Sequence, residues 1–151
     1  MAELILGIDI GTTSLETAVF TSTGQKVASA IMEYSLLTPE LNVVEAPCGI
    51  YMESIQACLA AMGQAGGVCL EDISTIGFSV QSETMLFLDE EGLPVRNAIV
   101  WMDNRAGEQA KRLKARFGDE LCYQVTGQVS FEACWPVAKV MWVREHEPQV
   151  Y

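Results

Sequence analysis

The residues best suited to chemistry lie near the start of the chain, in the segment GIDIGTTS (Gly7–Ser14). The apolar run Leu4–Ile10 contains one carboxylate, Asp9, and a Gly-Thr-Thr turn follows at once. A buried strand does not hold an isolated carboxylate cheaply, because its burial costs on the order of several kcal/mol unless it is paired or meets a metal. An acid at a strand end, beside small hydroxylated residues, suits a magnesium and phosphate site.

This segment therefore points to ATP chemistry. Asp9 is the candidate ligand that orients Mg²⁺ through water, because magnesium keeps much of its hydration. Backbone N–H and hydroxyl groups are the candidate phosphate donors, from Gly11, Thr12, Thr13 and Ser14. The alternative interpretation is an aspartate that merely caps a hairpin turn. No G-x-x-x-x-G-K-[ST] segment is present, which excludes a P-loop.

A second candidate segment is Gln81-Ser82-Glu83-Thr84, which follows the apolar run Ile73–Val80. Loops at strand ends are where open sheets bind ligands. Gln81 and Glu83 can donate to and accept from the hydroxyls of a polyol. The alternative is an ordinary polar turn.

A third candidate segment, Trp101-Met102-Asp103-Asn104-Arg105, places an aromatic ring beside charged groups. Such a ring packs on the C–H face of a sugar, while charged groups fix the directions of its hydroxyls. The alternative is a core Trp101 with Asp103 as a helix N-cap. Trp135 precedes the last predicted helix and can reach a ligand, whereas Trp142 lies within that helix and is expected in the core.

Composition excludes several classes of protein. The 151 residues are half hydrophobic, with mean hydropathy +0.21, so a globular domain is expected. A net charge of −11 argues against binding nucleic acid. Lys26 is the only basic residue before Arg96, so backbone donors and a metal must hold any phosphate there. Five scattered cysteines, the lack of a long apolar run and the lack of a secretory signal predict a cytoplasmic location without membrane contact.

Hydrophobic periodicity predicts an α/β chain. Leu4–Ile10 reads as a central strand and forms an antiparallel three-strand meander with Leu15–Thr21 and Lys26–Tyr34. A helix is expected over about 48–64, ended by Gly66-Gly67. Ile73–Val80 reads as a buried, central strand.

The second half predicts a hairpin of Met85–Asp89 with Ala98–Met102. A helix follows, capped by Asp103 or Asn104 and stopped by Gly118. The last helix covers Pro136–His146. No domain boundary is evident.

Taken together and in their order along the chain, the segments resemble those of the FGGY carbohydrate kinases, which include glycerol kinase, xylulokinase and gluconokinase. The resemblance covers essentially the whole chain. The matching segments are Leu6–Ser14, Val44-Glu45, Ile76–Ser79, Asn97–Ala106, and Thr126-Gly127 with Ala138–Trp142. The resemblance implies the ribonuclease-H-like fold of actin-like ATPases, with a mixed sheet flanked by helices, and phosphorylation of a sugar or polyol hydroxyl with Mg-ATP.

The resemblance also assigns residues. Asp9 and Thr13 fall in the phosphate and metal site. The substrate site would draw on Gln81, Ser82, Glu83, Thr84, Trp101, Asp103, Arg105 and Trp135. Gln81-Ser82-Glu83-Thr84 is most similar to the Gln-Arg-Glu-Thr of glycerol kinases, with Ser82 in place of their arginine, which favours a small polyol or an open-chain sugar.

Departures from the family pattern leave alternatives open. Glu16 stands where relatives generally carry Lys or Arg, and Cys134 and Trp135 compete for one aromatic position. By resemblance, residues 1–151 are the front part of the N-terminal domain, an incomplete domain. The catalytic aspartate, the adenine site and the second domain would lie beyond residue 151. The chain alone is therefore expected to be inactive.

Three further expectations complete the sequence interpretation. A degenerate, non-catalytic fragment that binds a sugar or a protein is the alternative function, supported by Glu16. Another actin-like ATPase, such as a chaperone or filament protein, shares the phosphate turn but leaves Trp101–Arg105 unexplained. An exposed sheet edge beyond Ile73–Val80 is expected, which a second copy of the chain could cover to form a homodimer.

Overall fold

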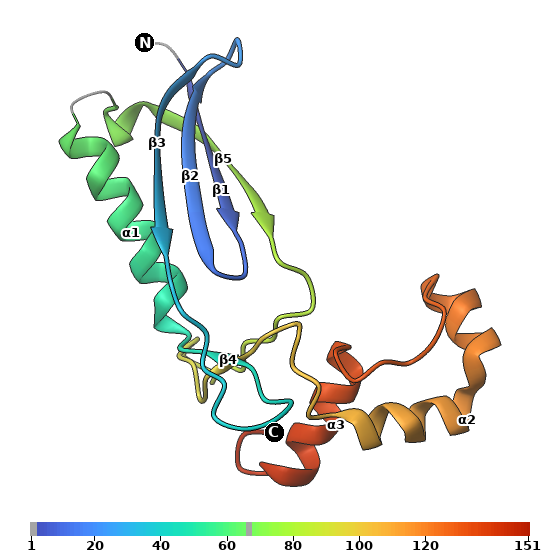
Figure 1. Ribbon diagram of the computed structural model, residues 1–151. Helices are drawn as coiled ribbons and strands as arrows, with labels where there is room; N and C mark the ends of the chain where they lie inside the picture. The colour runs from blue at the N-terminus through green and yellow to red at the C-terminus, as the bar shows by residue number, and fades with distance from the viewer. Residues whose placement is uncertain (1–2, 66–67) are drawn as a thin grey trace. The chain divides into compact units, whose positions relative to one another are not determined.

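The computed structural model describes residues 3–65 and 68–151, which form two compact units (Figure 1). The sheet unit contains Met1–Ser35 and Cys48–Gln81. The helical unit contains Leu36–Pro47 and Ser82–Tyr151. Each unit is built from two separate stretches of chain, which explains why the sequence shows no simple boundary between them.

A four-stranded mixed sheet with strand order β3-β2-β1-β5 forms the sheet unit. β1 (Leu4–Ile10), β2 (Ser14–Thr21) and β3 (Lys26–Glu33) are antiparallel neighbours. The predicted three-strand meander is therefore confirmed. β5 (Ile73–Val80) pairs parallel with β1, so both strands end at the same edge of the sheet.

Helix α1 (Gly49–Gln64) packs across β2 and β3 on one face of the sheet (Figure 1). Strand alternation sends Leu6, Leu15 and Val19 into this layer, where they meet the buried Cys58 and Met62 of the helix. The helix ends at Gln64, and the predicted stop at Gly66-Gly67 lies outside the described residues. A short 3₁₀ turn, Leu70–Asp72, leads into β5.

The prediction that Ile73–Val80 is buried and central is wrong. β5 is the edge strand, and its large apolar side chains Ile76, Phe78 and Val80 are each more than half exposed. They share a face with Leu6 and Ile8 of β1, but α1 covers β2 and β3. The predicted exposed edge is thus present, while its coverage by a second copy remains a prediction.

The helical unit contains a small sheet and two helices. β4 (Glu45–Ala46) pairs with β6 (Ala98–Ile99), and the helices are α2 (Gly107–Thr126) and α3 (Pro136–His146). The predicted hairpin is reduced to isolated bridges, Met85 with Ile99 and Leu88 with Pro94. Asp89 shapes its turn, because its Oδ1 accepts from the N–H groups two and four residues on.

Helix α2 corrects one prediction and bears out another. Ala106, and neither Asp103 nor Asn104, stands at its N-cap. Gly118, with φ 73° and ψ 162°, ends the first helical stretch as predicted, and a second stretch continues to Thr126, where Gly127 with φ 76° is the C-cap. The core between α2 and α3 combines the small residues Ala106, Ala110 and Ala138 with Leu113, and larger apolar side chains pack against it. No helix in the two described stretches is long and apolar enough to cross a membrane.

Candidate functional site

The Gly11–Ser14 turn joins β1 to β2 and is too tight for a side chain at its first position. The Gly11 N–H donates to the Ser14 carbonyl at 2.9 Å. A Cβ on Gly11 would lie 2.9 Å from that same oxygen. The Gly11 amide is therefore used inside the turn, and Thr12 and Thr13 form its tip.

Side chains and backbone from neighbouring strands hold this turn in place. The Gly11 carbonyl accepts hydrogen bonds from the Tyr34 hydroxyl and from Gln81 Nε2, the latter at 2.9 Å. The Tyr34 N–H donates to the Thr13 carbonyl, and the Gln81 N–H to the Ile10 carbonyl, both at 2.9 Å. Gln81 thus supports the Gly11–Ser14 turn, while Ser82, Glu83 and Thr84 belong to the helical unit.

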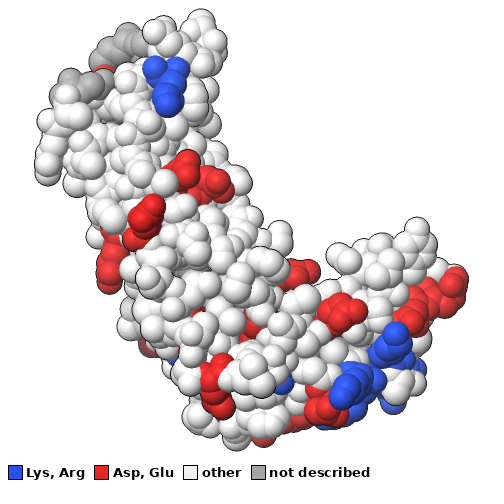
Figure 2. Space-filling model, viewed as in Figure 1, with Lys and Arg blue, Asp and Glu red and all other residues white. Residues whose placement is uncertain are grey.

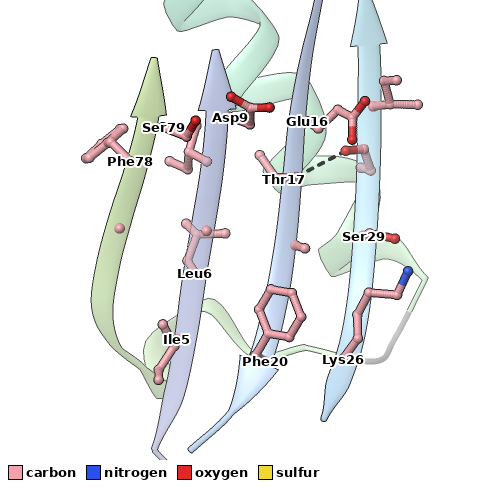
Figure 3. A pocket seen from close by; sticks show the side chains of 16 residues that line it. Ile5, Leu6, Asp9, Glu16, Thr17, Phe20, Lys26, Ser29, Phe78 and Ser79 are labelled. Carbon is pink, nitrogen blue, oxygen red and sulfur yellow. Dashed lines mark hydrogen bonds between the residues drawn. The ribbon is translucent and has the colours of Figure 1, made fainter. Parts of the chain in front are cut away.

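Asp9 lies on the exposed face of β1, so the premise that a strand buries this carboxylate is wrong. The β1–β2 register places Asp9 directly opposite Glu16, on the sheet face away from α1. Both line an open hollow of about 740 Å³ on this face (Figure 3). Figure 3 shows the two carboxylates at one end and Lys26 at the other, next to Phe20. The single basic residue of the unit is therefore remote from the turn.

Two tyrosines beside the turn are held neutral at physiological pH. Burial, and then the charge of Asp9, raise the pKa of Tyr34. Burial, and then the neighbouring Tyr34, raise the pKa of Tyr51 to about 12. The two rings meet edge to face, with centroids 5.9 Å apart. Tyr34 therefore remains a hydrogen-bond donor to the turn.

A magnesium ion would find a suitable donor set in Asp9 and Glu16. Mg²⁺ is ordinarily held by one or two carboxylates, several waters and the phosphates of a nucleotide. The described residues contain no group of three or more His, Cys, Asp or Glu side chains placed to hold a metal alone. The exposed Asp9 and Glu16 thus fit a hydrated ion shared with phosphate, and do not fit a caged structural metal.

In the helical unit, Asp103 forms the centre of a buried ion network. Its side chain is completely buried; Oδ2 accepts from the Val44 N–H at 2.7 Å. Arg105 binds both carboxylate oxygens, with N–O distances of 2.8 to 3.0 Å, and also contacts Glu45 at 2.7 Å. Burial acts to lower the pKa of Arg105, but the hydrogen bonds and charges of Asp103 and Glu45 outweigh it and raise that pKa.

Trp101, at the start of the same segment, is placed quite differently from Asp103. Trp101 is 39% exposed, and its backbone N–H donates to Thr84 Oγ1 at 3.0 Å. Glu83 precedes this threonine and has φ 63°, a left-handed backbone that is uncommon outside glycine. The structure therefore brings Glu83, Thr84 and Trp101 together within one unit, while Ser82 is exposed beside them.

Two further tryptophans lie on or beside α3. Trp135 is half-buried and packs against Phe131, with ring centroids 5.7 Å apart. Trp142 packs against the core of the unit, stacks on His146, and lies under the Arg105 guanidinium at 5.0 Å. The core position predicted for Trp142 is thus confirmed.

Lys139 is the residue that the sequence interpretation missed. It is completely buried on α3, and its ammonium donates to backbone carbonyls of the Glu83 and Trp101 segments. A lysine within a helix ordinarily predicts a solvated side chain. Its position between Ala138 and Val140, in an otherwise apolar stretch of the family-like segment Ala138–Trp142, is a sequence signal that could have found it.

The mixed sheet with its glycine turn and the helices of both units define an α/β fold. The profile of the FGGY family of carbohydrate kinases, N-terminal domain, matches residues 4–151. The chain therefore belongs to the FGGY family of carbohydrate kinases.

Individual relatives support the same assignment. A glycerol kinase of Streptococcus pneumoniae (strain Hungary19A-6) is 33% identical over 143 residues, which cover 94% of this chain and 28% of the relative. The crystal structure of a xylulose kinase from Rhodospirillum rubrum is similar with TM-score 0.87 and 25% identity, over 98% of this chain and 30% of that one. The crystal structure of Plasmodium falciparum glycerol kinase with ADP is similar with TM-score 0.87 and 23% identity, and the match covers 99% of this chain and 30% of that one. The chain thus spans less than a third of these proteins.

Proposed function

We propose that this chain supplies the first phosphate turn and part of the substrate wall of a kinase that transfers phosphate from Mg-ATP to a hydroxyl of a small polyol or sugar. The observation that carries the proposal is the Gly11–Ser14 turn with an exposed carboxylate at the end of its strand, in a chain that matches the family from residue 4 to 151. A relative crystallised with ADP supports ATP as the phosphate donor.

In this proposal Asp9 orients a hydrated Mg²⁺ ion. When bound, that ion supplies charge that neutralises the phosphate oxygens. The turn contributes hydrogen-bond donors from Thr12, Thr13 and Ser14, while Gly11 allows the chain to bend tightly. Tyr34 and Gln81 fix the Gly11 carbonyl, so they keep the turn in one shape before the nucleotide arrives. Preorganised donors need no rearrangement at the moment of reaction.

The polyol wall is proposed to consist of Glu83, Thr84 and Trp101. The exposed indole offers an apolar face to C–H groups, and the Glu83 carboxylate accepts from hydroxyls. Ser82 and Trp135 are expected at the margin of this wall. Asp103 and Arg105 act by holding the Trp101 segment, because both oxygens of the buried Asp103 carboxylate are already bonded within the protein.

A glycerol titration of isotopically labelled chain tests the wall. We expect glycerol, and more weakly xylulose or gluconate, to shift the amide signals of Glu83 and Trp101 in a ¹H–¹⁵N correlation spectrum. Trp101→Ala should remove these shifts, whereas Tyr123→Ala, which truncates an exposed aromatic on α2, should leave them. Equal losses in both variants would contradict the assignment.

A Mg-ADP titration tests the turn separately. Asp9→Asn should weaken binding, while Glu53→Gln, an exposed acid on α1, should not. A coupled assay of ADP release is expected to show no turnover by these 151 residues, since positioning and charge stabilisation draw on both domains of the family. Polyol-dependent ADP release from this chain alone would refute that part of the proposal.

The register of Glu16 favours a second candidate, a non-catalytic module that binds a sugar or a protein. Glu16 stands directly opposite Asp9, so two carboxylates flank the site proposed for phosphate. Without a bound cation they would repel a triphosphate. Glycerol binding without any Mg-ADP binding would favour this module over the kinase.

A further inference from the structure

The most unusual buried group in the molecule is the ammonium of Lys139. Lys139 is fully inaccessible and is the largest of the completely buried side chains. Removing an ammonium from water costs on the order of several kcal/mol, and an apolar side chain of similar volume would ordinarily be cheaper at such a position. Burial lowers the pKa of Lys139, partly opposed by the nearby charges of Asp103, Cys134 and Glu83.

Three backbone carbonyls surround this ammonium. Nζ donates to the carbonyl oxygens of Val100 at 2.9 Å, Glu83 at 3.1 Å and Trp101 at 3.3 Å. An ammonium has three donors and no acceptor, so this arrangement uses all of them. The carbonyls come from two stretches of chain that the Trp101 N–H and Thr84 Oγ1 also join.

The identity of the side chain matters because three carbonyl oxygens converge on one point. Without a cation, their partial negative charges would repel one another in a dry environment. A methionine would fill the volume but would leave the Glu83 and Trp101 oxygens without this donor. The ammonium therefore determines where these two backbone segments lie, in addition to filling space.

Backbone strain at Glu83 adds a second observation. A left-handed conformation at a residue other than glycine costs about 1 kcal/mol or more and persists only where the surroundings enforce it. Glu83 adopts φ 63°, and its own carbonyl is one of the three that Lys139 binds. The bond from Lys139 thus acts on the residue whose conformation needs support.

We propose that Lys139 is the positioning residue of the substrate wall, which holds Glu83 and Trp101 in their binding orientation through the three carbonyls. This inference rests on the proposed function for the ligand, while the positioning itself rests on the contacts above. Lys139 does not touch the polyol; it acts through the backbone of the residues that do.

The test compares Lys139→Met with Val143→Ala in the 151-residue chain. Val143 is also completely buried on α3, so its truncation destabilises the same unit without removing a donor to these carbonyls. We expect Lys139→Met to shift the amide signals of Glu83, Thr84 and Trp101 selectively and to weaken glycerol binding on the order of tenfold or more. Val143→Ala should lower stability but leave the glycerol affinity within twofold, roughly the scatter among independent sites.

Lys139→Gln retains two amide donors and serves as the milder variant if Lys139→Met does not fold. It should give intermediate signals and affinity. Unchanged Glu83 and Trp101 signals, or equal changes in Val143→Ala, would overturn the proposal. If neither Lys139 variant folds, the lysine is a general structural requirement, and the positioning role is likewise overturned.

The two hypotheses fail in different ways. If glycerol moves no signal in the unsubstituted chain, the proposed polyol site is wrong, and the ligand-free spectra of Lys139→Met still decide whether Lys139 positions Glu83 and Trp101. If glycerol binds normally to Lys139→Met, the positioning role fails while the polyol site stands.

Discussion

The sheet unit and the helical unit hold their candidate residues by opposite means. In the sheet unit, Lys26 is the only basic residue against seven acidic ones, and an apolar layer between α1 and the strands supports the exposed turn. In the helical unit, charged groups are themselves buried, and Asp103, Arg105 and Lys139 bind the backbone or side chains of neighbouring segments. The surfaces of the two units also differ in charge. Figure 2 shows scattered acidic patches on the sheet unit, whereas acidic and basic atoms lie side by side over α2.

Each candidate site therefore depends on a different kind of contact. The proposed phosphate turn depends on backbone shape, because its glycine and its carbonyl contacts fix where the donors point. The proposed polyol wall depends on paired charge, because its segments are tied through carboxylate, guanidinium and ammonium groups. All three tryptophans, Trp101, Trp135 and Trp142, lie in the helical unit, so their fluorescence reports on that unit alone.

Removing the centre of the ion network should have the largest effect. Asp103→Ala leaves Arg105 buried without its main partner, which ordinarily costs about 3–5 kcal/mol. We expect the helical unit to unfold at much lower urea, followed by tryptophan fluorescence, while hydrogen exchange in α1 stays protected. Asp119→Ala is the matched control, since its pair with Lys114 is exposed to solvent and should contribute little to stability. Parallel loss of α1 protection would contradict the separation of the two units.

The stability of the Gly11–Ser14 turn should depend on the absence of a side chain at Gly11. Gly11→Ala places a Cβ 2.9 Å from the Ser14 carbonyl, so the turn must open. Overpacking of this kind ordinarily costs about 1–3 kcal/mol, and we expect faster hydrogen exchange in β1 and β2 with unchanged tryptophan fluorescence. Gly77→Ala is the control, because a Cβ there meets nothing within 4 Å. A stable Gly11→Ala chain that binds Mg-ADP normally would show that the tight turn is dispensable.

Within both units, some features follow from the sequence and others do not. Strand alternation and turn residues are local, so the meander, α1 and α3 follow from periodicity within one or two residues. The burial of β5 depends on which elements cover it, and an apolar run alone does not contain that information. The same limit applies to Asp103 and Lys139, whose partners Val44 and Glu83 lie more than fifty residues away along the chain. The sequence therefore predicts which residues are chemically suitable but not which are already paired.

A buried hydroxyl beside the turn gives a smaller and pH-dependent effect. The buried Tyr51 hydroxyl meets only the Gln81 side chain, which is too poorly placed for an ordinary hydrogen bond, so Tyr51→Phe should stabilise the sheet unit by about 1 kcal/mol at neutral pH. The pKa of Tyr51 is raised to about 12, above the ordinary value of 10.0, so the folded state keeps a proton that the unfolded chain loses between these values. Stability should therefore be complete below pH 10 and fall as the pH rises toward 12.

Tyr51→Phe should reduce this alkaline loss, and the raised pKa of Tyr34 should leave a remainder. Urea unfolding at pH 9 and pH 11, followed by far-UV circular dichroism, measures the change. Tyr123→Phe, at an exposed site in the helical unit, is the control and should not alter the pH dependence. An alkaline loss of stability that is identical in Tyr51→Phe would show that other groups cause it.

The smallest expected effect concerns the two carboxylates that face each other across β1 and β2. Like charges directly opposite in a sheet are destabilising, so Glu16→Gln should raise the stability of the sheet unit by about 0.2–1 kcal/mol. The gain should shrink in high salt, because the charges are exposed and therefore screened. Glu33→Gln is the matched control, since its cross-strand partner is the uncharged Ser14.

Glu16→Gln also separates the two proposed functions. If Glu16 shares a magnesium ion with Asp9, Glu16→Gln should weaken Mg-ADP binding despite the gain in stability. Stronger nucleotide binding would show that Glu16 opposes phosphate, and it would favour the non-catalytic module.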